Sequence, residues 1–174
     1  VLRAERGTRM NGSRTMQPLL DIQGGKLAKS SGELLWTHHL TVAAVASGIV
    51  ELIQTMPERE KTVLQLACLT HDIGKVTDES QAVLRGERSG KCPHKLSVDA
   101  YVELVSDAAR TAGFSDEDIR FAHEVLATHH YVSEDDVRHT SSPRTAFLGD
   151  LVVAADRLAS MQAADRIQIG TLLK

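Results

Sequence analysis

Apolar residues recur every three or four positions along most of the chain, which is the period of an α-helix with one buried face. Between Leu35 and Leu52 this spacing predicts one long helix. Pro57 is suited to the first turn of a second helix, which we expect to continue to His71 and to end before Gly74. The first half of the chain therefore predicts a pair of helices joined by a short connection.

The second half of the chain shows the same helical period, interrupted by two polar loops. The expected elements are a loop over 75–94 with a short helix near 80–84, a helix over 96–112, a helix from 115 to 129, a loop over 131–143 and a helix over 144–165. Ser115 is followed three residues later by a carboxylate, which is the signature of a helix N-cap. No segment alternates convincingly between apolar and polar residues, so the sequence predicts an all-α fold with five or six main helices.

Residues 1–29 differ from the rest of the chain in charge. They contain six basic residues against two acidic ones, together with four glycines. We expect a flexible basic arm over 1–29, with a short helix near 18–22, and one domain over 30–174. The positive charge of such an arm would attract phosphate groups.

The composition excludes several classes of protein. With 174 residues, 42% apolar and 25% charged, the chain has enough apolar material for one globular core. It lacks an apolar run of 18 residues and an apolar leader, so we expect neither a membrane span nor a secretory signal. Two cysteines, Cys68 and Cys92, do not make a disulfide framework, and we expect a cytoplasmic location. Aromatic residues make up only 3%, which argues against a stacking platform for single-stranded bases.

Eight histidines are the unusual feature of the composition. Several histidines and aspartates fall at predicted helix ends, on apolar faces or in the long loop: His38, His71, Asp72, His94, His129, His130 and Asp156. Each alone could be a hydrogen-bonding core or loop residue. A carboxylate within an apolar stretch, such as Asp156, is costly to bury unless a cation compensates its charge. Imidazole and carboxylate ligands together suit Mn, Fe, Co, Ni or Zn more than Mg or Ca, so the set predicts a transition-metal site.

Three segments resemble the motifs of the HD superfamily of metal-dependent phosphohydrolases, and the resemblance covers residues 34–162. The most specific segment is Leu69-Thr70-His71-Asp72-Ile73-Gly74-Lys75. The segment His38-His39-Leu40-Thr41-Val42-Ala43 resembles the first motif, whose ligand histidine precedes Val-Ala by four residues and therefore corresponds to His38. The segment Ala154-Ala155-Asp156-Arg157-Leu158-Ala159-Ser160 resembles the closing aspartate motif. The resemblance implies a helical bundle with a metal site between the helices.

Superfamily members with extra histidines between the second and last motifs hold two metal ions, and this chain is similar to that group. The implied ligands are His38, His71 and Asp156 for one ion, and His94 with one or both of His129 and His130 for the other. The resemblance implies that Asp72 bridges the ions and that Lys75 contacts a substrate phosphate. The implied cofactors are two divalent transition metals (Mn, Ni, Co or Fe), which orient a phosphate and generate a hydroxide nucleophile.

Within the superfamily, the chain is most similar to the HD nuclease domain of CRISPR interference effectors. The segments that carry this similarity are residues 80–84 with Gln81, residues 94–97, and residues 127–130 with the paired histidines. Ser80 departs from the pattern, because an aromatic residue is usual there. The similarity implies hydrolysis of a phosphodiester in single-stranded DNA or RNA. We expect a helicase or CRISPR effector partner to be supplied by a separate or truncated module.

Other functions stay open at this point. HD phosphohydrolases also act on nucleotides and on cyclic dinucleotides, although the Gly-Tyr-Pro signature of the cyclic-dinucleotide group is replaced here by Tyr131-Val132-Ser133. A di-iron HD oxygenase and a non-catalytic HD binding module are further alternatives. Five basic residues form a candidate phosphate-binding rim: Lys75, Arg85, Arg88, Lys91 and Lys95. We expect changes at His39, His123 and His139 to have little effect.

Overall fold

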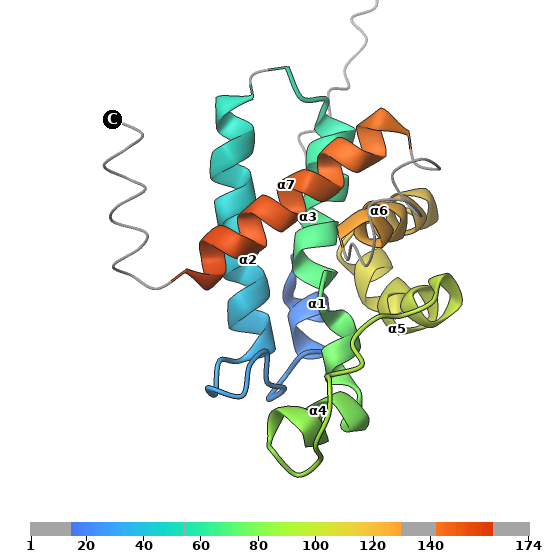
Figure 1. Cartoon of the computed structure of the whole chain (residues 1–174). Coiled ribbons are helices and arrows are strands. Elements are labelled where there is room, and N and C mark those ends of the chain that lie inside the picture. The colour runs from blue at the N-terminus through green and yellow to red at the C-terminus, as the bar shows by residue number, and fades with distance from the viewer. Residues whose placement is uncertain (1–14, 54, 130–141, 162–174) are drawn as a thin grey trace, which may run out of the picture.

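The computed structural model describes residues 15–53, 55–129 and 142–161 (Figure 1). The described elements are α1 (Gln17–Asp21), α2 (Leu35–Leu52), α3 (Glu58–Thr70), the 3-10 helix η1 (Ile73–Val76), α4 (Asp78–Leu84), α5 (Val98–Thr111), α6 (Asp116–His129) and α7 (Pro143–Ser160). Within these residues the only β pairing is an isolated bridge between Leu27 and Leu34. The all-α prediction is confirmed, and the five helices of 13 to 18 residues match the five or six main helices expected.

Helices α2, α3 and α7 form the centre of the molecule. α2 and α3 pack against each other, and α7 runs diagonally across both (Figure 1). The core between them is aliphatic, and it includes the fully buried Val42, Leu66, Leu148 and Val152. Burial of such side chains contributes about 1.5–3 kcal/mol each to folding. This three-helix layer fixes the start of α2 and the end of α3 relative to α7.

Helices α5 and α6 complete the bundle on one side of α3 and α7. Gly149 lets α6 and α7 approach closely, because a Cβ atom at this position would lie 1.8 Å from Thr128 Oγ1. The side chains of Ser97 and Ser142 cap α5 and α7 by accepting hydrogen bonds from backbone N–H groups. Close packing on α3 and α7 therefore holds α6, the helix that carries His129, against the central layer.

Some helix ends differ from those that the periodicity predicts. The last helix ends at Ser160 rather than at Asp165, since Met161 has extended backbone angles of −67° and 146°. α5 begins at Val98 rather than at Leu96, because Ser97 provides the N-cap. The short helix expected near residues 80–84 starts earlier, at Asp78, behind a Thr77 cap. In each case a local capping or backbone feature, rather than the apolar pattern, sets the boundary.

Residues 15–29 pack onto the helical body, which differs from the flexible arm expected over residues 1–29. Leu19 of α1 is completely buried, and Gln23 just after α1 is also buried. The Gln23 amide donates hydrogen bonds to the backbone oxygens of Leu19 and Leu69, at 2.8 and 3.0 Å. The segment packs onto the body because Leu19 joins the apolar core and Gln23 forms a hydrogen bond with the end of α3. The rest of the expected arm, residues 1–14, lies outside the described residues.

None of the described helices combines the length and the apolar character that are needed to cross a bilayer. Cys68 is buried in the core and Cys92 is partly buried, and both carry free thiols. Burial raises the pKa of the Cys68 thiol to about 12, so this side chain is an inert part of the core.

Candidate metal centre

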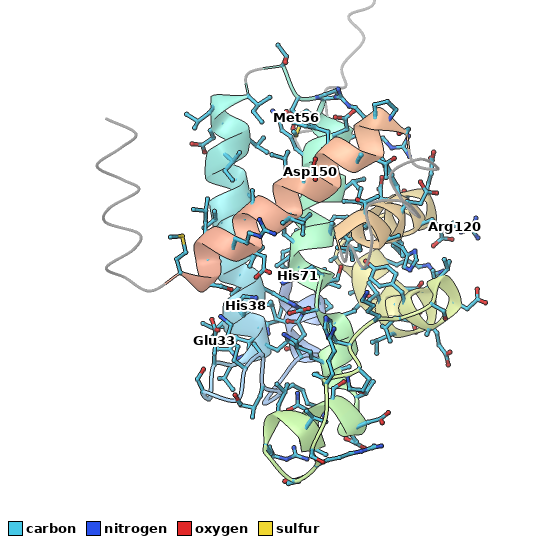
Figure 2. The ribbon with its side chains drawn as sticks, in the orientation of Figure 1. Glu33, His38, Met56, His71, Arg120 and Asp150 are labelled. Carbon is cyan, nitrogen blue, oxygen red and sulfur yellow. The ribbon has the colours of Figure 1, made fainter. Side chains whose placement is uncertain are left out.

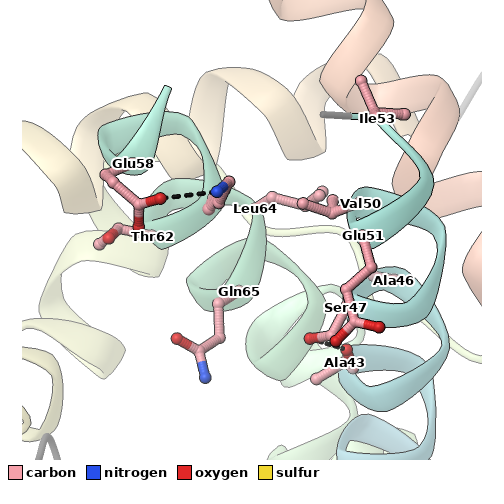
Figure 3. Close-up of a pocket in the computed structure, with 11 residues that line it drawn as sticks. Ala43, Ala46, Ser47, Val50, Glu51, Ile53, Glu58, Thr62, Leu64 and Gln65 are labelled. Atoms are coloured by element: carbon pink, nitrogen blue, oxygen red, sulfur yellow. Dashed lines mark hydrogen bonds and ion pairs between the residues drawn. The ribbon is translucent and has the colours of Figure 1, made fainter. Parts of the chain in front are cut away.

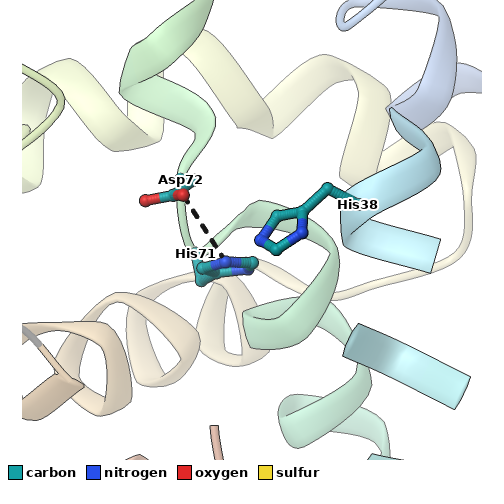
Figure 4. A group of neighbouring side chains, drawn as sticks. All are labelled: His38, His71 and Asp72. Carbon is teal, nitrogen blue, oxygen red and sulfur yellow. Dashed lines mark ion pairs between the residues drawn. The ribbon is translucent and has the colours of Figure 1, made fainter. Parts of the chain in front are cut away.

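Four elements bring their functional side chains to one place. His38 lies in the first turns of α2, His71 and Asp72 follow the last residue of α3, His94 lies in the loop before α5, and Asp156 lies in α7. Figure 2 shows His38 and His71 close to each other near the middle of the view, whereas Met56 lies near the top. One ligand atom each from His38, His71 and Asp72 lies within 4.8 Å of the other two, and all three residues are buried (Figure 4). The structure thus brings together the residues that the sequence motifs singled out.

Asp156 approaches this cluster from α7. Its Oδ1 atom lies 3.1 Å from His38 Nε2 and 3.8 Å from His71 Nε2. Burial raises the pKa of Asp156, but the hydrogen bond with His38 and the interaction with His71 outweigh burial and lower this pKa to about 2. Asp156 is therefore ionised at neutral pH and adds a negative charge to the cluster.

Asp72 lies between His71 and His94. Its Oδ2 atom is 3.7 Å from His71 Nε2, and its Oδ1 atom is 3.6 Å from His94 Nε2. Burial raises the pKa of Asp72, but its interactions with His71 and Lys75 outweigh burial and hold that pKa well below the usual range of a carboxyl. An ionised carboxylate with one oxygen toward each imidazole has the geometry that a bridging ligand needs.

Backbone carbonyls set the orientation of two of these imidazoles. His71 Nδ1 is 2.9 Å from the Cys68 oxygen, and His94 Nδ1 is 3.0 Å from the Cys92 oxygen. A carbonyl oxygen only accepts, so Nδ1 carries a proton in both rings, and Nε2 is the atom that each ring turns toward Asp72. Burial also lowers the pKa of His71, so its ring is neutral at pH 7. A lone pair that faces two ionised carboxylates is unfavourable without a cation between them, and this donor set fits a divalent transition metal.

His38 occupies a different setting, because its ring lies between two carboxylates. Its Nε2 atom faces Asp156, and its buried Nδ1 atom lies 3.5 Å from Glu33 Oε1. A carboxylate behind a ligand histidine orients the ring and raises its basicity. Glu33 was not singled out from the sequence, because it precedes α2 and belongs to no motif.

His39 is a second residue that sequence reasoning missed. It was expected to matter little, yet its side chain is completely buried and its Nε2 atom accepts a hydrogen bond of 3.3 Å from the Asp72 N–H. The same ring contacts Gln23 through Nδ1, at 2.8 Å. Because the Nε2 lone pair is engaged with a backbone N–H, the geometry favours His38 over its neighbour as a metal ligand. The pair of adjacent histidines at positions 38 and 39 was the signal available in the sequence.

The Lys75 ammonium is paired with the cluster of His38, His71, Asp72 and Asp156. Its Nζ atom donates to Asp72 Oδ2 at 2.6 Å and to the Ala28 oxygen at 3.0 Å. Gln81 is buried beneath this region, and its amide donates to the backbone oxygens of Leu27 and Lys75. The predicted Lys75 ammonium is thus held at the edge of the site by the segment before α2.

His94 is placed by close contact with the segment after α3. A Cβ atom on Gly74 would lie 2.0 Å from the His94 backbone oxygen, so only glycine leaves room for this loop. Ser80 reinforces the contact by donating to the backbone oxygens of Gly74 and Pro93, both at 3.2 Å. Glycine is therefore needed at position 74 because any side chain there would displace the backbone of the loop that carries His94.

The remaining predicted ligands cannot be placed in the same way. His129 is the last residue of α6, and His130 lies outside the described residues. Their roles, and the assignment of ligands to two separate ions, stay predictions. His139 also lies outside the described residues, whereas the ring of His123 lies 5.2 Å from that of Tyr101 in the α5–α6 interface.

The candidate phosphate-binding rim is less positive than its sequence indicates. Arg85 forms an ion pair with Glu87 at 2.7 Å, and Arg88 forms one with Glu79 at 2.7 Å. These contacts are exposed, so each contributes little to stability, but they neutralise the arginine charges locally. The rim therefore offers less attraction to a polyanion than five unpaired cations would.

A separate cavity of about 460 Å³ lies between α2 and α3 (Figure 3). It is lined by Ala43, Ala46, Ser47, Val50, Glu51, Ile53, Glu58, Lys61, Thr62, Leu64 and Gln65. These residues lie toward the ends of α2 and α3 that are away from His38 and His71. Its one lysine, Lys61, forms an ion pair with Glu58 at 2.6 Å. The cavity is thus distinct from the histidine–aspartate cluster.

Comparison with known proteins agrees with this geometry. Residues 35–161, most of the chain, match the family described as the HD domain. No curated protein and no solved structure matches the chain. The match confirms the superfamily that the three motifs predicted, whereas the relationship to CRISPR effectors stays a prediction.

Proposed function

The chain belongs to the HD domain family, whose members are in general metal-dependent hydrolases, and from this premise we propose that it is a two-metal phosphodiesterase that cleaves single-stranded DNA or RNA. The observation that carries the proposal is the position of Asp72. Its carboxylate lies between the Nε2 atoms of His71 and His94, at 3.7 and 3.6 Å, and can offer one oxygen to each of two ions.

The residues divide into two sets around this carboxylate. His38, His71 and Asp156 would hold the first ion together with Asp72, and His94 would hold the second with one or both of His129 and His130. When bound, such ions supply Lewis acidity toward a phosphate and a nucleophile from water at neutral pH. Mn, Ni, Co and Fe are the candidates, because the ligand set mixes imidazole with carboxylate.

Lys75 is the chain's own candidate for contacting substrate. Two of its three N–H groups point at Asp72 and at the Ala28 oxygen, which leaves the third to meet a phosphate oxygen at the edge of the site. A fixed ammonium next to a developing negative charge stabilises the transition state without having to reorganise. Lys75 therefore positions and neutralises the phosphate rather than transferring a proton.

The similarity of residues 80–84, 94–97 and 127–130 to CRISPR nuclease domains supports a nucleic-acid substrate and a helicase or effector complex as partner. Free thiols at Cys68 and Cys92 are compatible with the reducing cytoplasm that we propose as its location.

A nucleotide or cyclic dinucleotide is the second candidate substrate. The observation that favours it is the pairing of Arg85 and Arg88 with nearby glutamates, which reduces the positive charge available to a long polyanion. A small substrate needs only the cations at the site itself.

The test is hydrolysis by metal-stripped protein to which Mn²⁺ or Ni²⁺ is restored. Circular single-stranded DNA, single-stranded RNA, nucleotides and cyclic dinucleotides are offered in parallel, beside the Asp72→Ala variant. Cutting of the circle by the wild type alone supports the nuclease proposal, and hydrolysis of small substrates alone supports the second candidate. Equal activity of the variant, or no hydrolysis by a metal-loaded wild type, contradicts both and leaves an oxygenase or a binding module.

A further inference from the structure

His39 has no part in the function proposed above, although it lies next to a candidate ligand. Its side chain is completely buried, and its ring centroid is 4.7 Å from that of His71. A histidine in such a place must have its ring nitrogens satisfied, since a buried polar group without a hydrogen-bond partner destabilises the fold. The partners of its two nitrogens therefore show what the ring does.

The first partner is Gln23, whose amide orientation is fixed by the backbone. Its Nε2 atom donates to the oxygens of Leu19 and Leu69, at 2.8 and 3.0 Å, and these contacts use both of its N–H groups. The amide oxygen must then be the atom that faces His39 Nδ1, at 2.8 Å. An amide oxygen only accepts, so Nδ1 of His39 carries a proton.

The second partner is the backbone of Asp72. The N–H of Asp72 donates to His39 Nε2 over 3.3 Å, which requires an unprotonated Nε2 atom with a lone pair. Both contacts together define one species, the neutral imidazole protonated on Nδ1. Asp72 lies just beyond the end of α3, where its buried N–H needs an acceptor from elsewhere in the molecule.

We propose that His39 is a positioning residue, held by Gln23, that fixes the backbone of Asp72 and so directs its carboxylate between the two metal ions. This inference rests on the proposed function, because the carboxylate matters as a bridging ligand there. The ring reaches Asp72 from α2, and Gln23 comes from the segment before it. The central ligand is thus supported by His39, which lies in the first motif segment beside the candidate ligand, and by Gln23, which lies outside the three motif segments.

Two other roles for His39 fit the contacts less well. A metal ligand would need the Nε2 lone pair, and this lone pair already accepts from the Asp72 N–H. A purely packing role would be served by an apolar ring, yet such a ring would leave the Gln23 oxygen and the Asp72 N–H buried without these contacts.

A matched pair of substitutions separates positioning from packing. In His39→Gln the side-chain amide reaches about as far as Nε2, so its oxygen can still accept from Asp72. In His39→Asn the shorter amide reaches only as far as Nδ1, so it can donate to Gln23 but leaves the Asp72 N–H without its acceptor. The measurement is the affinity of the metal-stripped full chain for Mn²⁺ alone, by calorimetric titration, with thermal unfolding of each metal-free variant as the stability control.

We expect His39→Asn to bind Mn²⁺ about 10–100-fold more weakly than the wild type, which is the usual effect of losing an outer contact of a metal site. His39→Gln should bind Mn²⁺ with an affinity close to that of the wild type. Equal losses in the two variants, or no loss in His39→Asn, overturn the proposal and leave the proposed function standing. A wild type that does not bind Mn²⁺ contradicts the proposed function itself.

A spectroscopic measurement on the wild type keeps the proposal falsifiable if either variant does not fold. Long-range ¹H–¹⁵N correlation in the metal-free protein reports which nitrogen of each imidazole carries a proton. We expect His39 to show a protonated Nδ1 and an unprotonated Nε2 at pH 7. A protonated Nε2 would remove the acceptor for Asp72 and overturn the inference.

Discussion

At the scale of single residues, the candidate site depends on one buried carboxylate that contacts groups from three segments. Asp72 faces His71 and His94, forms an ion pair of 2.6 Å with Lys75, and donates its N–H to His39. His71 and Lys75 face Oδ2, His94 faces Oδ1, and His39 contacts the backbone N–H, so all three polar groups of the residue are engaged. Changes at Asp72 should therefore affect metal binding more than changes at any other single position.

Asp72→Asn tests this expectation with little change in volume. The amide keeps the shape and the backbone hydrogen bond to His39, but it removes the negative charge that balances Lys75 and a bound cation. We expect Mn²⁺ binding and hydrolysis to be lost while the helical circular dichroism is retained. Asp150→Asn is the matched control, because Asp150 lies in α7 and is not a candidate ligand. This variant should bind Mn²⁺ as the wild type does.

Gly74→Ala tests how His94 is placed. The added Cβ would lie 2.0 Å from the His94 backbone oxygen, so the loop must move away from Asp72. We expect a loss of about 1–3 kcal/mol in the free energy of unfolding, as for other overpacked sites, and a weaker second Mn²⁺ equivalent in titration.

Gly48→Ala is the control for Gly74→Ala, because a Cβ at Gly48 in α2 meets nothing within 4 Å. Alanine is the better helix former there by about 1 kcal/mol, so this variant should be slightly more stable and bind metal normally. Normal binding of two Mn²⁺ equivalents by Gly74→Ala would show that His94 does not depend on this contact.

The residues that the sequence predicted and those that it missed differ in how their contacts arise. His38, His71 and Asp156 could be found because they belong to motifs with fixed local spacing. Gln23 could not, since its partner His39 lies on another element and only the folded chain brings them together. Glu33 lies close to His38 in the sequence, but it belongs to no motif. The His39 contact with Asp72 joins residues 33 positions apart, so the fold alone reveals it.

At the scale of elements, the main difference between sequence and structure is the segment before α2. Its basic and glycine-rich composition predicts an arm, whereas residues 15–29 supply Leu19 to the core, Gln23 to His39 and the Ala28 oxygen to Lys75. Composition describes the average of a segment, but a few well-placed side chains decide whether it packs. The helices themselves were predictable, because their apolar period extends over many residues.

Removal of residues 1–29 tests the role of this segment. The shortened chain should lose thermal stability and bind Mn²⁺ more weakly, because the core loses Leu19 and both His39 and Lys75 lose a partner. A chain that begins at residue 15 is the matched control and should keep both properties. Unchanged stability and Mn²⁺ affinity after the longer deletion would contradict the packing described here.

At the scale of the whole molecule, the site joins elements that would otherwise be held by packing alone. The start of α2, the end of α3, the loop before α5 and the C-terminal part of α7 all contribute to it. A cation bound there would cross-link these elements in the folded state but not in the unfolded chain. Metal binding should therefore stabilise the fold as a whole.

Thermal unfolding with and without Mn²⁺ tests this linkage. At a free metal concentration of 100 times the dissociation constant, a single site adds about 2.7 kcal/mol to the free energy of unfolding. We expect a higher unfolding temperature for the wild type with Mn²⁺, no such increase for Asp72→Asn, and a return to the lower temperature after chelation. An equal increase in wild type and variant would place the bound metal elsewhere.

The net charge of −3 and the local pairing of the rim arginines do not by themselves favour a polyanionic substrate. The central claim is therefore the metal centre, on which every candidate activity depends.

The most direct test is the number of Mn²⁺ ions bound per chain, determined by titration and elemental analysis, together with electron paramagnetic resonance of the loaded protein. The account predicts two ions with the magnetic coupling of a carboxylate-bridged pair, and their loss in Asp72→Asn. A wild type that binds no Mn²⁺, or that binds two uncoupled ions which persist in Asp72→Asn, would contradict it.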